Sequence, residues 1–194
     1  ITFQNNGLII NAEGFYKTAS GLSQFLFNRE QRGTPTETID GESRAYGIDL
    51  FLKQELYSHD FWISYTLSRT EENFSRDNRD EYVRSPHDQL HEFKGAAIFN
   101  FNPWYFSLNY VYGSGLYDSD NLLKEGLNPY HRLDLAILYK FNDDSYNIET
   151  GISIVNLFDY ENIGYSGFSH LPGGERVYER GIPFTPSLFM NIGI

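Results

Sequence analysis

Residues 130–156 read YHRLDLAILYKFNDDSYNIETGISIVN, and their pattern decides the fold class. Side chains of two kinds alternate along both halves of this stretch, and a period of two residues predicts β-strands. In the first half, one face carries Leu133, Leu135, Ile137, Tyr139 and Phe141, and the other carries Arg132, Asp134, Ala136, Leu138 and Lys140. The polar residues 142–146 predict a turn. The stretch is therefore expected to form an antiparallel hairpin with one apolar face and one charged face.

The same alternation recurs along the chain and predicts about eight strands. They are expected at about residues 8–18, 44–56, 61–68, 90–101, 104–112, 130–141, 147–156 and 187–194, and residues 1–3 are expected to end an earlier strand. The connections are long, at about 20–42, 71–88, 113–129 and 159–183, and they alternate strictly with turns of two to five residues. This asymmetry is typical of outer-membrane β-barrels, which have short periplasmic turns and long external loops.

Aromatic residues are expected to form two belts, one at each membrane interface. The residues beside the short turns are Tyr57, Phe61, Trp62, Phe101, Trp104, Tyr105, Phe141 and Tyr146, and those at the other strand ends are Tyr16, Tyr46, Phe93, Tyr112 and Tyr130. The alternative is a soluble sandwich with aromatic rims, which would need a second layer to cover the apolar face.

The amino-acid composition excludes several further classes of protein and ligand. The 194 residues carry a formal net charge of -11, which argues against binding to nucleic acid because phosphates would be repelled. Cysteine is absent, so disulfides and thiolate metal sites are excluded. The sequence contains no apolar run near the length of a transmembrane helix. It begins at Ile1 rather than Met, so we expect either a removed signal or the C-terminal part of a longer protein.

Several motifs together resemble the last strands of TonB-dependent outer-membrane receptors. They are YHRLDLAILYKF (130–141), GISIVNLFDYENIGY (151–165) and RGIPFTPSLFMNIGI (180–194), preceded by AYGIDLFLKQEL (45–56), FWISYTLSRTEENFS (61–75) and SLNYVYGSGLYDS (107–119). The resemblance covers about residues 7–194, and the sequence of the motifs is similar to that of receptors of the Bacteroidetes type. The chain departs from the family in ending in Ile194, where an aromatic residue is usual.

The resemblance implies an all-β, antiparallel transmembrane β-barrel of 22 strands, of which residues 1–194 supply about the last eight. It also implies TonB-dependent uptake across the outer membrane of a Gram-negative bacterium, by a receptor that is not an enzyme and has no cofactor. The ligand is left open among siderophore, cobalamin, oligosaccharide and peptide. The expected partners are outer-membrane lipid and lipopolysaccharide, the remaining barrel and plug domain, the TonB complex through an N-terminal part, and a surface lipoprotein.

No catalytic, cofactor or metal site is predicted. The run from His87 to His91 faintly resembles the zinc motif HExxH, but Asp88 replaces the glutamate and the context is a strand entrance rather than a helix. Residues 118–120 and 77–81 are acidic without the spacing of a calcium loop. Residues 113–115, Gly-Ser-Gly, are too short to cradle a phosphate, and the acceptor tripeptide 73–75 has no meaning outside a glycosylating pathway.

Charge gives the remaining functional hint. The four long connections carry about -2, -3, -2 and -2, so most of the net charge of -11 is expected at one end of the barrel. One interpretation is ordinary solvated loops. The other is an acidic outer vestibule that favours cationic or metal-bearing ligands, with the loops holding the ligand contacts. Two other proteins fit parts of the pattern, a complete eight-stranded outer-membrane barrel with a structural or adhesive role and a soluble lipocalin-like binder.

Overall fold

The computed structural model describes residues 1–27, 35–74, 81–116, 128–143, 146–168 and 176–193. Its strands are β1 (Thr2–Asn5), β2 (Leu8–Phe27), β3 (Pro35–Leu56), β4 (His59–Phe74), β5 (Val83–Arg84), β6 (His91–Phe101), β7 (Trp104–Gly113), β8 (Tyr130–Asn142), β9 (Asn147–Val155), β10 (Ile163–Phe168), β11 (Arg176–Arg180) and β12 (Thr185–Gly193). Within these residues, no helix is long and apolar enough to cross a membrane.

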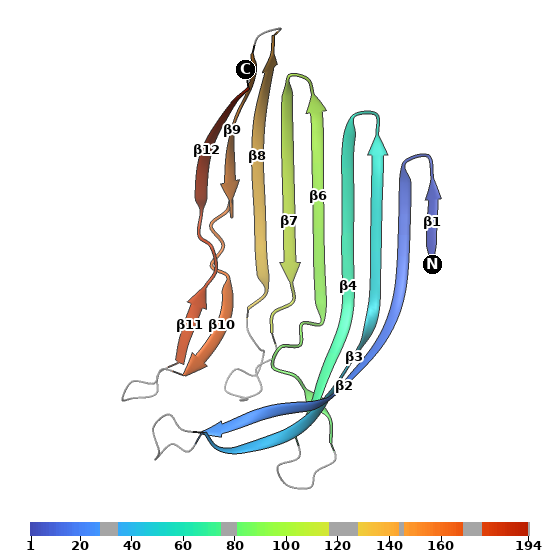
Figure 1. The fold of residues 1–194 in the computed structure, drawn as a ribbon, viewed down its shortest axis with the longest axis vertical. Coiled ribbons are helices and arrows are strands. Elements are labelled where there is room, and N and C mark those ends of the chain that lie inside the picture. The colour runs from blue at the N-terminus through green and yellow to red at the C-terminus, as the bar shows by residue number, and fades with distance from the viewer. Residues whose placement is uncertain (28–34, 75–80, 117–127, 144–145, 169–175, 194) are drawn as a thin grey trace.

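Ten of the described strands form one antiparallel sheet in the order β1-β2-β3-β4-β6-β7-β8-β9-β12, with β5 paired to β4 off this path. Strands β10 and β11 pair separately as a hairpin between β9 and β12. The tight turns gather at the upper end in Figure 1, and the long connections leave from the lower end. The predicted all-β fold and the predicted separation of short turns from long connections are both confirmed.

The register of the sheet confirms the two faces predicted for residues 130–156. Leu135 on β8 lies opposite Leu108 on β7 and Ile154 on β9, while Ala136 lies opposite Ser107 and Ser153. Residues directly opposite in antiparallel strands share a face. We call the Leu135 side the apolar face and the Ala136 side the polar face.

The first long connection was predicted wrongly. Residues 20–42 were expected to be a connection, but β2 continues to Phe27 and β3 begins at Pro35. A bulge between Ser20 and Leu22 interrupts their pairing, and Gly21 supplies its positive φ of 73°. The ladder continues through pairs such as Ser23 and Asp40. The prediction failed because residues 20–27 and 35–42 lack the alternation of apolar and polar residues on which it depended.

Other boundaries moved by smaller amounts. β4 continues to Phe74, into the predicted connection 71–88, and that connection also contributes β5. The connection 159–183 contains the β10–β11 hairpin. The expected earlier strand at residues 1–3 is confirmed as β1, which pairs with β2.

The apolar face has no second layer. Among the described residues, Ile39 is the sole buried hydrophobic side chain, whereas Leu188 is 81% exposed and Leu50 is 45% exposed. The sheet is also open, because β12 pairs with β9 and β1 pairs with β2 at opposite edges. These edges and the apolar face must therefore be covered by something other than the described residues.

Candidate functional site: the polar face and its outer pocket

The apolar face lies between two belts of aromatic side chains and histidines. Rings in contact near the tight turns include His59–Phe101 (5.0 Å), Phe61–Phe99 (5.4 Å) and Trp104–Tyr139 (4.8 Å). Those near the long connections include Tyr16–Tyr46 (6.3 Å), Tyr65–His91 (6.2 Å) and Tyr112–His131 (5.1 Å). In the described part of the sheet, the apolar face carries no Asp, Glu, Lys or Arg between these belts. This arrangement is typical of a surface that faces lipid.

Three residues assigned to the belts lie instead on the polar face. Trp62 is opposite Lys53, Tyr105 is opposite Asn100, and Tyr130 is opposite Gly113. Their sequence positions near strand ends suggested belt membership, but the two-residue period turns their side chains the other way.

Four cations of the polar face lie in short-range ion pairs among the described residues. The pairs are Lys53–Glu55 (2.5 Å), Lys94–Glu92 (2.8 Å), Arg132–Asp134 (3.1 Å) and Lys140–Glu149 (2.6 Å). All of these side chains are at least partly exposed. Charged side chains on one face and apolar side chains on the other imply that the polar face meets water or a polar partner.

Glu13 and Asp49 add negative charge to the polar face, and neither is in an ion pair within the part of the chain that the structure describes. They lie directly opposite each other on β2 and β3, and Asp49 accepts a hydrogen bond from Thr66 Oγ1 at 2.6 Å. Like charges in register are destabilising unless solvent screens them. Their pairing is therefore further reason to place water against this face.

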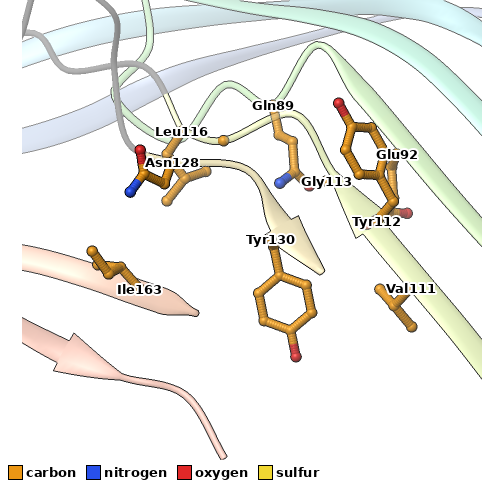
Figure 2. Close-up of a pocket in the computed structure, with 10 residues that line it drawn as sticks. Gln89, Glu92, Val111, Tyr112, Gly113, Leu116, Asn128, Tyr130 and Ile163 are labelled. Carbon is orange, nitrogen blue, oxygen red and sulfur yellow. The ribbon is translucent and has the colours of Figure 1, made fainter. Parts of the chain in front are cut away.

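A pocket opens at the end of the polar face from which the long connections leave. Figure 2 shows its lining, which comprises Gln89, Glu92, Val111, Tyr112, Gly113, Gly115, Leu116, Asn128, Tyr130 and Ile163 around a volume of about 250 Å³. A side chain at position 113 would displace the Gln89 amide, because its Cβ would lie 2.1 Å from Gln89 Nε2. Arg132 donates a hydrogen bond of 3.3 Å to the Tyr130 hydroxyl. The pocket thus offers amide, carboxylate and hydroxyl groups beside apolar walls, which suits a polar small ligand.

The entrance to β6 is fixed by the buried residues Ser85 and Asp88. Asp88 accepts hydrogen bonds from Arg84 Nε (2.5 Å) and from the Thr70 backbone N–H (2.6 Å), while Ser85 Oγ donates to Glu72 (2.6 Å). Beside them, Tyr82 donates a hydrogen bond of 3.0 Å to Glu42, which raises the pKa of the Tyr82 phenol. These contacts tie the end of the second long connection to β4.

Asn156 and Asn162 fix the last connection in a similar way. Asn156 is fully buried, donates through Nδ2 to the carbonyls of Tyr160 and Ile182 at 3.0 Å, and accepts from the Tyr160 N–H at 3.1 Å. Asn162 pairs with both backbone groups of His131 at 2.8 and 2.7 Å. The motif at 151–165 therefore has a structural explanation, because its asparagines satisfy backbone groups where the sheet ends.

The other motifs do not form sites in the described residues. His87 donates its backbone N–H to Ser85, whereas His91 Nδ1 meets the Tyr65 hydroxyl at 2.8 Å, so the two histidines have separate partners. Ser114 joins its backbone and hydroxyl to His91, which gives the Gly-Ser-Gly run a turn-closing role. Residues 118–120 and 77–80 lie outside the described residues. Among the described residues, no group of three or more His, Cys, Asp or Glu could hold a metal ion.

These features define the class of protein to which the chain belongs. An open antiparallel sheet with one apolar, belted face and one charged face is typical of the wall of a transmembrane β-barrel. Residues 1–157 match the family model described as TonB dependent receptor-like, beta-barrel, and the chain therefore belongs to this family. No curated protein matches the chain. The family consists of outer-membrane receptors and transporters.

Proposed function

We propose that residues 1–194 form the C-terminal part of the barrel wall of an outer-membrane receptor that imports a ligand with energy supplied through TonB. The observation that carries the proposal is the contrast between the two faces of one sheet, combined with the family match over residues 1–157. The apolar face would meet membrane lipid and lipopolysaccharide. The polar face would line the path of the ligand and contact the plug domain.

The other partners follow from this placement. The sheet edges at β1 and β12 are available to pair with the remaining strands of a 22-stranded barrel. The TonB complex would be engaged through a part of the receptor outside this chain. The protein would reside in the outer membrane of a Gram-negative bacterium, and a surface lipoprotein is a further predicted partner at its outer end.

The ligand remains open among siderophore, cobalamin, oligosaccharide and peptide. The negative charge of the long connections and the Glu13–Asp49 pair favour a cationic or metal-bearing ligand. The pocket around Glu92 and Tyr130 supplies hydrogen-bonding groups on the same side. We therefore expect the outer half of the polar face to make the first contacts with the ligand.

The open sheet weighs against a complete eight-stranded barrel. Such a barrel would pair its first strand with its last, yet β12 pairs with β9 and β2 pairs with β1 and β3. A soluble lipocalin-like binder is also disfavoured, because it would direct its apolar face inward and its polar face outward.

The test uses the whole receptor in its native cell. Three strains lacking the receptor, the TonB protein or both are grown with a siderophore, cobalamin, an oligosaccharide or a peptide as the limiting nutrient. We expect loss of the receptor to stop growth on one ligand class, loss of TonB to stop it equally, and the double deletion to add nothing. A receptor gene restored on a plasmid is the control. Unchanged growth of the receptor deletion on all four classes would contradict the proposal.

A further inference from the structure

The outer pocket is built around a gap in one row of the polar face. Glu92 on β6 lies opposite Gly113 on β7, and Gly113 in turn lies opposite Tyr130 on β8. Because Gly113 has no side chain, the row is open between the carboxylate and the phenol ring. The Gln89 side chain lies beside this gap, since a Cβ at position 113 would be 2.1 Å from its Nε2 (Figure 2). The glycine therefore makes room for both the pocket and the amide that enters it.

The walls of the pocket are held in place by the fold itself. Asn162 pairs through its side chain with both backbone groups of His131, at 2.8 and 2.7 Å, so that Ile163 is fixed beside β8. Gly115 is buried and has a positive φ of 85°, a conformation that glycine adopts readily, and Leu116 follows it into the lining. A preorganised site loses little free energy in ordering its own side chains when a ligand binds.

The pocket presents hydrogen-bonding groups that have no other use in the described residues. The side-chain amides of Gln89 and Asn128 have no hydrogen-bond partner within the part of the chain that the structure describes. Glu92 uses Oε1 in its ion pair, which leaves Oε2 to accept. The Tyr130 hydroxyl accepts from Arg132 Nη1 at 3.3 Å, so its own hydrogen can be donated. These groups together can satisfy a ligand that donates and accepts at several neighbouring atoms.

The charges at the floor of the pocket cancel in pairs. Glu92 lies 2.8 Å from Lys94, and Arg132 lies 3.1 Å from Asp134. A carboxylate beside a cation attracts a second cation much less than an isolated carboxylate does. The pocket therefore suits an uncharged group, whatever charge the rest of the ligand carries toward the acidic long connections.

Size and wall chemistry restrict the uncharged group further. The volume of about 250 Å³ lies below the roughly 300–1,000 Å³ of pockets for drug-sized ligands, so it accommodates a single ring. Val111, Leu116 and Ile163 supply apolar walls, and Tyr130 supplies an aromatic one. A sugar ring combines apolar C–H faces with an edge of hydroxyl groups, each of which donates and accepts. Amides beside apolar walls match both features of such a ring.

We propose that the outer pocket binds one uncharged sugar ring of an oligosaccharide, with Gln89, Asn128 and Glu92 on its hydroxyls and Tyr130 against its apolar face. The inference rests on the proposed import function and narrows its four ligand classes to one. The pocket opens on the polar face, so the free oligosaccharide in the ligand path is its source of sugar, rather than the lipopolysaccharide around the apolar face.

The experiment screens the purified full-length receptor against an array of neutral oligosaccharides built from glucose, galactose, mannose, xylose or N-acetylglucosamine. We expect binding to at least one of them. In titration calorimetry with that oligosaccharide, Gln89→Leu should weaken binding roughly tenfold, because a sugar hydroxyl loses its partner in the pocket. Asn128→Leu should have an effect of similar size. Asn109→Leu is the matched control, since it removes an exposed amide of the polar face that does not line the pocket, and it should leave binding unchanged.

Equally tight binding by the wild-type, Gln89→Leu and Asn128→Leu receptors would overturn the inference, as would the absence of binding to every oligosaccharide on the array. Binding of a ferric siderophore or a cationic peptide that depends on Gln89, with no sugar binding, would overturn it as well. If Gln89→Leu fails to fold, Gln89→Glu keeps the shape of the side chain and adds a charge, and it should also weaken sugar binding.

The growth test of the receptor and TonB deletions separates this inference from the proposed function. A receptor that is needed with TonB for growth on a siderophore, and that binds no neutral sugar, contradicts the sugar site alone. A receptor that binds an oligosaccharide through Gln89, but whose loss leaves growth unchanged on all four ligand classes, contradicts the import function and supports the sugar site.

Discussion

Leu135 and Ala136 are neighbours on β8, yet they lie on faces with opposite chemistry. Among the residues that the structure describes, the Leu135 face has no charged side chain between its belts, whereas the Ala136 face carries four ion pairs. Even the polar side chain of Thr150 on the apolar face is satisfied internally, since it donates to the Phe189 carbonyl at 3.1 Å. A side chain facing lipid must find its hydrogen bonds within the protein, whereas one facing the lumen can use water.

The largest expected difference between the faces comes from placing the same charge on each. An arginine facing lipid near the bilayer midplane costs about 2–4 kcal/mol. We expect Leu135→Arg to lower the free energy of unfolding from lipid by about this amount, and Ala136→Arg to lower it much less. Reversible unfolding of the full receptor in lipid measures both variants.

Single cysteines at the same two positions provide an independent reading. A water-soluble thiol reagent should modify Ala136→Cys more readily than Leu135→Cys in a barrel emptied of its plug. Equal costs for the two arginines, or a reversed order, would show that the two faces have been assigned wrongly. The chain would then have to be a soluble sheet.

Glycines on the two faces give the next test. Gly151 lies on the polar face beneath Phe189, and a Cβ there would lie 2.5 Å from the Ile137 carbonyl oxygen and 2.7 Å from the Phe189 ring. Gly14 on the apolar face has its nearest neighbour at 4.0 Å. We expect Gly151→Ala to cost about 1–3 kcal/mol through overpacking, and Gly14→Ala to cost little. The same unfolding measurement compares them, and equal effects would contradict the close packing at Gly151.

The ends of the strands add a third region to the comparison of the two faces. There, side-chain hydrogen bonds to the backbone hold the chain. Asn156 makes three side-chain hydrogen bonds there and has a positive φ of 55°. We expect Asn156→Ala to cost roughly 1–2 kcal/mol. It should also speed amide hydrogen exchange in residues 157–162 while leaving β8 protected. Asn156→Gly relieves the backbone strain but not the lost hydrogen bonds, so exchange as slow as in the wild type would show that the hydrogen bonds matter little.

The sequence predicted the parts of the fold in which one face meets lipid. Alternation located β6 to β9 within one or two residues, because every second side chain there must be apolar. It missed the outer extensions of β2 and β3, where the alternation of apolar and polar residues disappears from the sequence. The alternation of apolar and polar residues therefore depends on contact with the membrane as well as on the strand conformation.

The candidate site was less predictable for a different reason. The residues that line the pocket come from four strands and two connections, and their spacing in the sequence does not predict that they lie together. Asn156 and Asn162 act through backbone groups in an irregular segment, where no periodicity marks a buried polar side chain. Arg69 lies 3.8 Å from both Glu71 and Asp88, and only the folded strands bring these three side chains together.

The smallest predicted effect concerns the Glu92–Lys94 pair on the polar face, whose atoms are 2.8 Å apart with side chains 39% and 43% exposed. A partly exposed pair in water couples by about 0.2–1 kcal/mol, and salt weakens it further. A double-mutant cycle with Glu92→Gln and Lys94→Gln should therefore give a coupling in that range that falls as ionic strength rises. A coupling of several kcal/mol that does not respond to salt would mean that water is excluded from this face. The plug would then have to cover Glu92 closely, and the outer pocket could not be open to a ligand arriving from outside the cell.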